Sequence, residues 1–181
     1  MTYPHHFESS VDVAAPPAVL FGEIDDPERL AAHMTQSSMM MAGGAMRYAY
    51  DEAAGKAVGS KIIMSGSMLG IPLGLEEVVR EREPPFRKTW ETLGEPRLLV
   101  IGGYRMGFEI AEAADGSRLT VFIDWRDPPP PWRWLGRFLG RTYAKWCVEG
   151  MARGAAKHFR DLPAAAAPPP DHRRPSGRPP L

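Results

Sequence analysis

Two adjacent carboxylates, Glu76 and Glu77, are the residues of this chain whose position best suits acid–base chemistry. In an extended strand, Glu77 has the same parity as the apolar residues Leu75 and Val79, so its side chain would point into the protein. Burial raises the pKa of a carboxyl group, which would make Glu77 a candidate acid or base. The competing register would place Glu76 inside instead, and a third interpretation leaves both glutamates in water near a strand end.

Two tyrosines could assist such a glutamate. Tyr48 and Tyr104 lie on apolar faces of predicted strands, where a hydroxyl group could orient a substrate or move a proton. Together with Glu77 they are the catalytic candidates. The single cysteine, Cys147, has no histidine beside it in the sequence and is expected to be a buried structural thiol. The chain shows no serine nucleophile elbow and no zinc-ligand spacing, so we expect no metal and no cofactor.

The composition predicts one globular domain followed by a tail. The chain has 181 residues and is 44% hydrophobic, which suffices for a sizeable core over residues 1–162. Residues 163–181 contain seven prolines and almost no large apolar side chains. Such a segment cannot bury enough surface to fold, so we expect a disordered Pro/Ala-rich tail.

The charge balance argues against nucleic acid as a partner. The chain has 22 basic and 22 acidic residues, and residues 1–162 have 19 and 21. Nucleic-acid binding needs a concentrated positive field, which this balance does not provide. No run reaches the roughly 20 apolar residues of a membrane span. The N-terminus lacks the apolar segment of a signal peptide, so we expect a cytoplasmic protein.

Alternating apolar residues predict strands along most of the chain. The expected strands cover residues 5–14, 45–51, 60–68, 75–82, 87–93, 98–111 and 118–127. Short helices are expected over 18–24 and 28–34, where Asp25 or Asp26 would cap the second helix. A glycine-containing turn is expected over 69–74, and Pro96 should interrupt the chain before the longest strand.

The longest element is a predicted helix over residues 132–162, which follows four consecutive prolines. Five residues of its first half should face the core: Leu135, Leu139, Thr142, Tyr143 and Trp146. Four basic residues form a stripe at intervals of four: Arg133, Arg137, Arg141 and Lys145. The stripe could bind anionic lipid or nucleic acid, while the plainer interpretation is a solvated outer face.

This order of elements resembles the helix-grip fold of the START-like superfamily, also called SRPBCC or polyketide cyclase/dehydrase and lipid transport-like. Local sequence agrees with that resemblance. Residues 11–21, VDVAAPPAVLF, look like the opening of the family, and residues 25–30, DDPERL, look like the segment that follows. Residues 81–85, EREPP, and 116–121, GSRLTV, look like its later strand boundaries. The resemblance covers residues 7–162 and implies an α+β fold in which a curved antiparallel sheet of six or seven strands wraps around a long C-terminal helix.

The resemblance also implies an apolar cavity between sheet and helix that holds a lipid, sterol, polyketide, plant hormone or quinone. The inward positions predict its lining: Tyr48, Met64, Met68, Trp90, Tyr104, Met106, Phe108, Ile123, Leu139 and Tyr143. The alternative is that these residues fill a solid core.

Two functions follow from the resemblance: a carrier of a hydrophobic small molecule, or an aromatase/cyclase-type enzyme in which Tyr48, Glu77 or Tyr104 acts on a polyketide-like substrate. The sequence also allows transient contact of the protein with a membrane surface. The sequence specifies neither the ligand nor the oligomeric state.

Overall fold

The computed structural model describes residues 2–31, 46–68 and 70–161, and side chains are described for all of these except Met46 and Met68. The expected tail over 163–181 and the end of the expected second helix lie outside the described residues. The elements in chain order are β1 (His5–Val13), α1 (Pro17–Ile24), α2 (Pro27–Leu30), β2 (Met46–Tyr50), β3 (Lys61–Met68), β4 (Ile71–Glu83), β5 (Arg87–Arg97), β6 (Tyr104–Ala113), β7 (Gly116–Trp125) and α4 (Arg133–Asp161).

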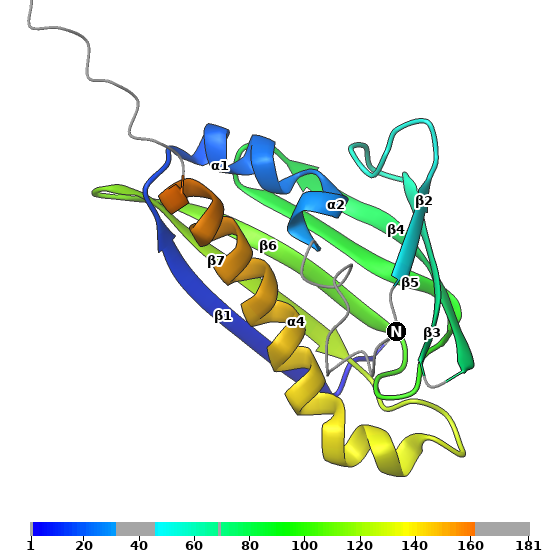
Figure 1. Cartoon of the computed structure of the whole chain (residues 1–181). Helices are drawn as coiled ribbons and strands as arrows, with labels where there is room; N and C mark the ends of the chain where they lie inside the picture. The colour runs from blue at the N-terminus through cyan, green and yellow to red at the C-terminus, as the bar shows by residue number, and fades with distance from the viewer. Residues whose placement is uncertain (1, 32–45, 69, 162–181) are drawn as a thin grey trace, which may run out of the picture.

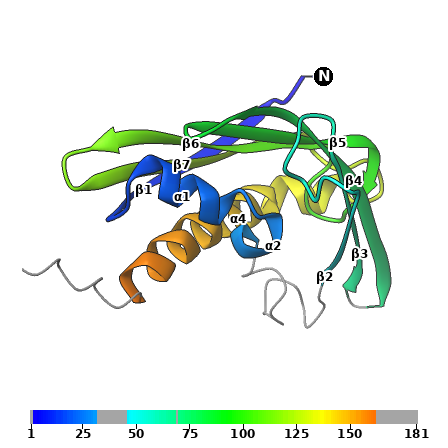
Figure 2. The same ribbon diagram turned by 90° about the horizontal axis from the view of Figure 1, so that it is seen from above.

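The seven strands form one antiparallel sheet in the order β1-β7-β6-β5-β4-β3-β2. The helices α1, α2 and α4 all lie on its concave side, where the sheet curls around them (Figures 1 and 2). Helix α4 crosses in front of β1 and β7. The predicted α+β helix-grip fold is therefore confirmed, with seven strands, a long C-terminal helix and two short helices after β1.

Helix α4 packs closely because its buried positions carry mainly small side chains. They are Gly136, Gly140, Ala144, Cys147, Val148, Met151, Ala152, Ala155 and Ala156. A Cβ atom at Gly136 would lie 2.3 Å from Cδ of Pro128, so only glycine fits there. The expectation that Leu139 and Thr142 face the core is wrong, since Leu139 is 45% exposed and Thr142 is exposed as well. The other three predicted residues, Leu135, Tyr143 and Trp146, do pack against the core, but the fully buried positions of this part of the helix are small: Gly136, Gly140 and Ala144.

The expected strand over 98–111 is wrong in its first six residues. Strand β5 continues through Pro96 to Arg97, and β6 begins only at Tyr104. Between them the chain turns toward the end of β7, where Gly102 N–H donates to the carbonyl of Arg126 at 2.8 Å. A Cβ atom at Gly102 would lie 2.6 Å from the carbonyl oxygen of Asp127, so this approach requires glycine.

Strand β4 also differs from the expectation and positions two clusters of polar residues. It begins at Ile71, so most of the expected turn over 69–74 is strand. Its pairing with β5 shifts between Gly74 and Glu76, and again between Val79 and Glu81. A bulge changes which side chains face inward. After the second shift Arg82 lies opposite Lys88 of β5.

Candidate functional site

An internal cavity lies between the concave side of the sheet, the two short helices and α4. The volume that the centres of water molecules can occupy in this cavity is about 70 Å³. A single water needs only ~10–15 Å³ on the same measure. Its walls are mostly aliphatic and aromatic. They are formed by Ile24, Pro27, Leu30, Tyr48, Ile62, Met64, Leu73, Leu75, Glu77, Lys88, Trp90, Leu98, Leu99, Val100, Ile101, Tyr104, Met106, Ile123, Tyr143, Cys147 and Met151.

Among the described residues, the one carboxylate in this lining is Glu77 of β4. It pairs with Ile62 of β3 and Thr92 of β5, and both of these partners are buried. Its side chain therefore points into the cavity and is 3% exposed. Glu76 points outward, where it forms an ion pair with Lys61 at 2.8 Å. Of the two registers that the sequence left open, the structure has the one that buries Glu77.

Burial raises the pKa of Glu77 to about 7, because the apolar surroundings disfavour the carboxylate. Hydrogen bonds from Tyr104 and Trp90 act in the opposite direction but do not outweigh the loss of solvation. The Tyr104 hydroxyl donates to Oε1 of Glu77. Near neutral pH, Glu77 can therefore either donate or accept a proton inside an apolar cavity, which is the property of a general acid or base.

A second hydroxyl group is available near Glu77. Tyr48 of β2 lines the cavity, and its buried Oη has no hydrogen-bond partner among the described residues. Burial raises the pKa of Tyr48, and the nearby Glu77 carboxylate raises it further. The ring of Tyr50 stacks on that of Tyr48 with centroids 6.2 Å apart. A buried hydroxyl without a partner costs free energy, so Tyr48 is suited to meet a polar atom of a ligand.

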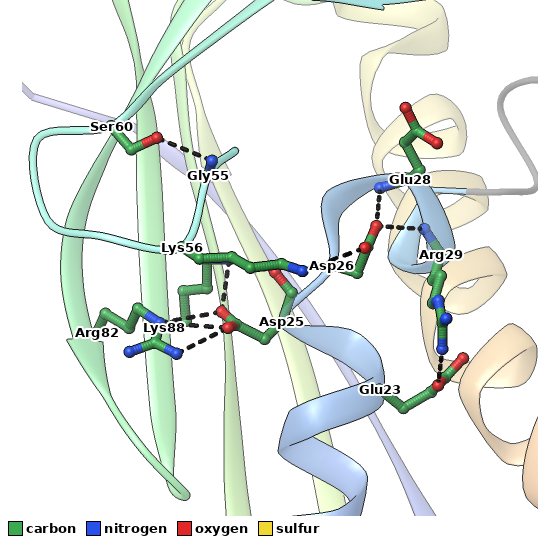
Figure 3. Close-up of polar contacts among 10 residues, drawn as sticks. All are labelled: Glu23, Asp25, Asp26, Glu28, Arg29, Gly55, Lys56, Ser60, Arg82 and Lys88. Atoms are coloured by element: carbon green, nitrogen blue, oxygen red, sulfur yellow. Dashed lines mark hydrogen bonds and ion pairs between the residues drawn. The ribbon is translucent and has the colours of Figure 1, made fainter. Parts of the chain in front are cut away.

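Asp25 forms the second buried polar cluster, at the end of α1 (Figure 3). Lys88 Nζ donates to its Oδ1 at 2.8 Å and to its carbonyl oxygen at 2.7 Å. Arg82 Nη2 donates to Oδ2 at 2.8 Å. Burial acts to raise the pKa of Asp25, but the hydrogen bonds from Arg82 and Lys88 outweigh it and lower that pKa. Asp26, and not Asp25, caps α2 by accepting from the amides of Glu28 and Arg29.

Helix α4 contributes Tyr143, Cys147 and Met151 to the cavity wall. Burial raises the pKa of Cys147 to about 12, while a hydrogen bond with Tyr143 acts against the rise. The thiol is therefore protonated at neutral pH and is not an activated nucleophile. This agrees with the expected role of Cys147 as a buried structural residue.

Seven of the ten predicted lining residues border the cavity. They are Tyr48, Met64, Trp90, Tyr104, Met106, Ile123 and Tyr143. Phe108 is fully buried but packs between the rings of Phe21 and Trp90, so it belongs to the core and not to the wall. Leu139 lies on the exposed side of α4 and does not reach the cavity. Met68 ends β3, and its side chain lies outside the described part of the chain.

The predicted lining left out several parts of the wall, among them Ile24 of α1 and Pro27 and Leu30 of α2. Four consecutive residues, 98–101, line the cavity, and their signal was an apolar residue at every position instead of the alternation of a strand. Lys88 was also missed, because lysine is rarely buried unless it is paired. Only its pairing with Asp25, far away in the sequence, explains its position.

Within the described residues, no group of three or more histidine, cysteine, aspartate or glutamate side chains is arranged to hold a metal ion. No helix in this part of the chain is long and apolar enough to cross a membrane.

Comparison with known proteins supports the fold. No protein-family model matches the chain, and no curated protein matches it in sequence. Solved structures do match. A protein from Thermus thermophilus is 13% identical with a TM-score of 0.63, and the match covers 86% of this chain and 97% of that one.

Two further matches bear the names Ara h 8.0201 and major latex-like protein 151, the latter from Panax ginseng. Ara h 8.0201 is 12% identical with a TM-score of 0.56, and the match covers 87% of this chain and 99% of that one. The ginseng protein is 12% identical with a TM-score of 0.58, and the match covers 90% of this chain and 100% of that one. At these identities the likeness establishes a shared helix-grip fold.

Proposed function

We propose that this chain is a START-like protein that binds one apolar small molecule in its cavity, with a polar group of the ligand held by Glu77, Tyr104 and Tyr48. The observation that carries the proposal is the position of Glu77. Among the described residues no cation contacts the oxygens of the Glu77 carboxyl group, so its burial is costly to the fold, and a ligand that hydrogen-bonds to it would offset part of that cost. The proposed domain is residues 1–162, with residues 163–181 as a dispensable tail.

The shape and lining of the cavity support a ligand with an apolar body. Met64, Met106 and Met151 can adapt to ligands of different outline, because methionine side chains are flexible and polarizable. Trp90 and Tyr143 offer flat surfaces to a ring. Few polar groups with defined directions in a largely apolar wall are the usual arrangement of a small-molecule site. A lipid, polyketide or quinone with one hydroxyl or carbonyl group fits this description.

An aromatase/cyclase-type enzyme is the second candidate, and a specific observation favours it. Glu77 has a pKa near neutral, and two tyrosine hydroxyls lie around it, so an acid and possible proton donors converge on one point of the cavity. A carrier needs only to bind its ligand, whereas an enzyme must change it. Mass spectrometry of a polyketide-like compound before and after incubation with the protein separates these two functions, with Glu77→Gln as the inactive control.

The test of ligand binding compares two substitutions on one strand. Met106 and Phe108 lie two residues apart on the same face of β6, but only Met106 borders the cavity. Met106→Trp should fill the cavity, keep most of the stability and abolish binding of an apolar fluorescent probe. Phe108→Trp should overpack the core, lower the stability by about 1–3 kcal/mol and leave probe binding to the folded fraction intact.

The wild-type protein should also carry a small molecule through gentle purification, visible by native mass spectrometry. The proposal fails if wild type binds no probe and carries no ligand, or if Met106→Trp binds the probe as well as wild type does.

A further inference from the structure

The first half of α4 exposes large apolar side chains to solvent. Phe138 is 78% exposed, Trp134 is 58% exposed and Leu139 is 45% exposed. These three residues lie within two turns of one helix. Single exposed apolar residues are common, but a cluster that includes two aromatic rings marks a surface that contacts something apolar.

The same half of the helix is basic. From residue 128 to 148 the chain contains Arg133, Arg137, Arg141 and Lys145 and no acidic residue. All four basic side chains are exposed. Among the described residues, no ion pair is formed by the three arginines, while Lys145 lies 3.7 Å from Glu149. The guanidinium of Arg141 also lies 6.0 Å from the centroid of the Phe7 ring. The exposed aromatic residues are therefore set in a positively charged surface.

The packing of α4 explains why these residues face outward. Gly136 and Gly140 bring the helix against the segment between β5 and β6, where a Cβ atom on either would lie 3.0 or 3.3 Å from the carbonyl oxygen of Val100. No large side chain fits on that inner side. Trp134 and Phe138 therefore project away from the core, and their rings are not needed for the packing of this helix.

We propose that the first half of α4, from Arg133 to Lys145, docks on the surface of an anionic lipid bilayer. Tryptophan and phenylalanine on a basic helix are suited to the boundary between headgroups and acyl chains. The arginines would contact lipid phosphates, as basic residues do beside anionic membranes. Nucleic acid fits less well, because it offers phosphate charge but no apolar layer for Trp134 and Phe138. Figure 1 shows the first turns of α4, in yellow, at one end of the molecule.

This surface lies beside one wall of the cavity. Val100 and Ile101 line the cavity, and the same two residues are the neighbours of Gly140 on α4. Docking would therefore hold one wall of the cavity close to the bilayer, which is a suitable position for taking an apolar ligand from it. Docking itself uses only exposed residues of α4. It does not depend on the proposed function, and it should also occur in the Met106→Trp protein.

The experiment is co-sedimentation of the full chain with vesicles of phosphatidylcholine, with and without phosphatidylglycerol. We expect binding only to the anionic vesicles, and weaker binding as salt concentration rises. Two double variants test the two components of the surface. Arg133→Glu with Arg137→Glu should lower partitioning about tenfold or more, because each basic residue near an anionic surface contributes about a fivefold factor. Trp134→Ser with Phe138→Ser should lower it by a similar factor through loss of the apolar contact.

Matched controls separate this surface from general charge and hydrophobicity. Lys157→Glu with Arg160→Glu makes the same change in charge on exposed residues of the second half of α4. Val58→Ser with Phe86→Ser removes two exposed apolar side chains elsewhere. Both controls should bind vesicles within about twofold of wild type, since the altered residues lie outside the proposed surface. Lipids brominated on their acyl chains should quench tryptophan fluorescence in wild type and less so in Trp134→Phe.

The proposal is overturned if the protein does not bind anionic vesicles. It is also overturned if Trp134→Ser with Phe138→Ser binds as well as wild type, or if the Lys157 and Arg160 control loses as much binding as the Arg133 and Arg137 variant. Binding to duplex DNA that is lost in the Arg133 and Arg137 variant, in a protein that ignores vesicles, would assign the surface to nucleic acid instead.

Discussion

Two carboxylates are buried to the same extent in this protein but have opposite surroundings. Asp25 is 4% exposed and accepts hydrogen bonds from two cations, Lys88 and Arg82. Glu77 is 3% exposed and accepts hydrogen bonds from neutral donors, Tyr104 and Trp90. The pKa of Asp25 is lowered and that of Glu77 is raised. The comparison separates an acid that holds elements of the fold together from an acid that is left available to a ligand.

The register of β4 explains how one sheet contributes to both sites. Both involve β4, which contributes Glu77 before the second register shift and Arg82 after it. Without the shift, alternation from Glu77 would turn Glu81 toward Asp25, which would place two acids together. The bulge therefore allows one strand to present a carboxyl group to the cavity and the guanidinium cation of Arg82 to Asp25.

The largest change in stability is expected at Asp25, where the buried charges are paired. Asp25→Asn keeps the shape of the side chain but leaves Lys88 and Arg82 without their carboxylate. Because Lys88 is buried, its charge is then uncompensated, and we expect a loss of about 3–5 kcal/mol in the free energy of unfolding at neutral pH. Urea denaturation of both proteins measures this difference.

The effect of Asp25→Asn should also depend on pH in a defined direction. Because the pKa of Asp25 is lower in the folded than in the unfolded protein, its contribution is present above the unfolded pKa and is lost as the pH falls through the folded pKa. The difference between variant and wild type should therefore shrink in acid. Asp12→Asn is the control, since Asp12 pairs with Arg118 on the exposed surface and should affect stability little. Equal losses in both variants would show that the buried pairing is unimportant.

Glu77→Gln should raise the stability of the protein at neutral pH, whereas Asp25→Asn should lower it. The pKa of Glu77 rises from an ordinary 4.5 to about 7 on folding, so the folded protein binds the proton more tightly. Ionised Glu77 thus lowers stability as pH rises between about 4.5 and 7, by about 3 kcal/mol in total. Glutamine removes this cost, while its carbonyl oxygen can still accept from Tyr104.

The variant Glu77→Gln should therefore match wild type near pH 4.5 and be more stable above pH 7. Thermal unfolding across this range, in protein freed of ligand, gives the comparison. A variant that is less stable than wild type at pH 8 would mean that Glu77 is stabilised in the fold by a partner charge, as Asp25 is.

The smallest effect on stability is expected at Tyr48. Its buried hydroxyl group has no partner among the described residues, so Tyr48→Phe should leave stability unchanged or raise it by up to about 1 kcal/mol. If this hydroxyl meets a polar atom of the ligand, the same change should weaken binding of the co-purifying molecule by about fivefold or more. Tyr104→Phe is the matched variant. It should lower stability, because it removes the donor to Glu77. Unchanged affinity in Tyr48→Phe would remove this residue from the proposed anchor.

The sequence predicted those parts of this structure that depend on local periodicity. Strand alternation identified the inward faces of β1, β3, β6 and β7, and with them Tyr104, Met106 and Ile123. It also placed Glu77 on the inner side in one of two registers. The choice between Glu76 and Glu77 depends on pairing with β3 and β5, which a single strand does not encode.

The parts of the structure that the sequence did not predict depend on contacts between segments that are distant in the chain. The segment over 98–103 leaves the sheet because Gly102 meets the end of β7. Lys88 is buried because it forms an ion pair with Asp25, at 2.8 Å. Leu139 faces solvent because the glycines of α4, and not its leucines, meet the segment that contains Val100. Hydrophobicity alone gives no sign of a helix that uses its smallest residues for packing.

The order of the strands also has a consequence for synthesis of the chain on the ribosome. Strand β1 pairs with β7, so that Phe7 lies opposite Ile123, and α4 then packs on both strands. Strand β1 therefore has no strand to pair with until β7 has been translated, when most of the domain is already complete. The β3–β4 and β4–β5 hairpins can form earlier, as they emerge from the ribosome. Ribosome-bound chains arrested before residue 116 should remain sensitive to protease over residues 5–13, and that sensitivity should fall only once β7 and α4 have left the exit tunnel.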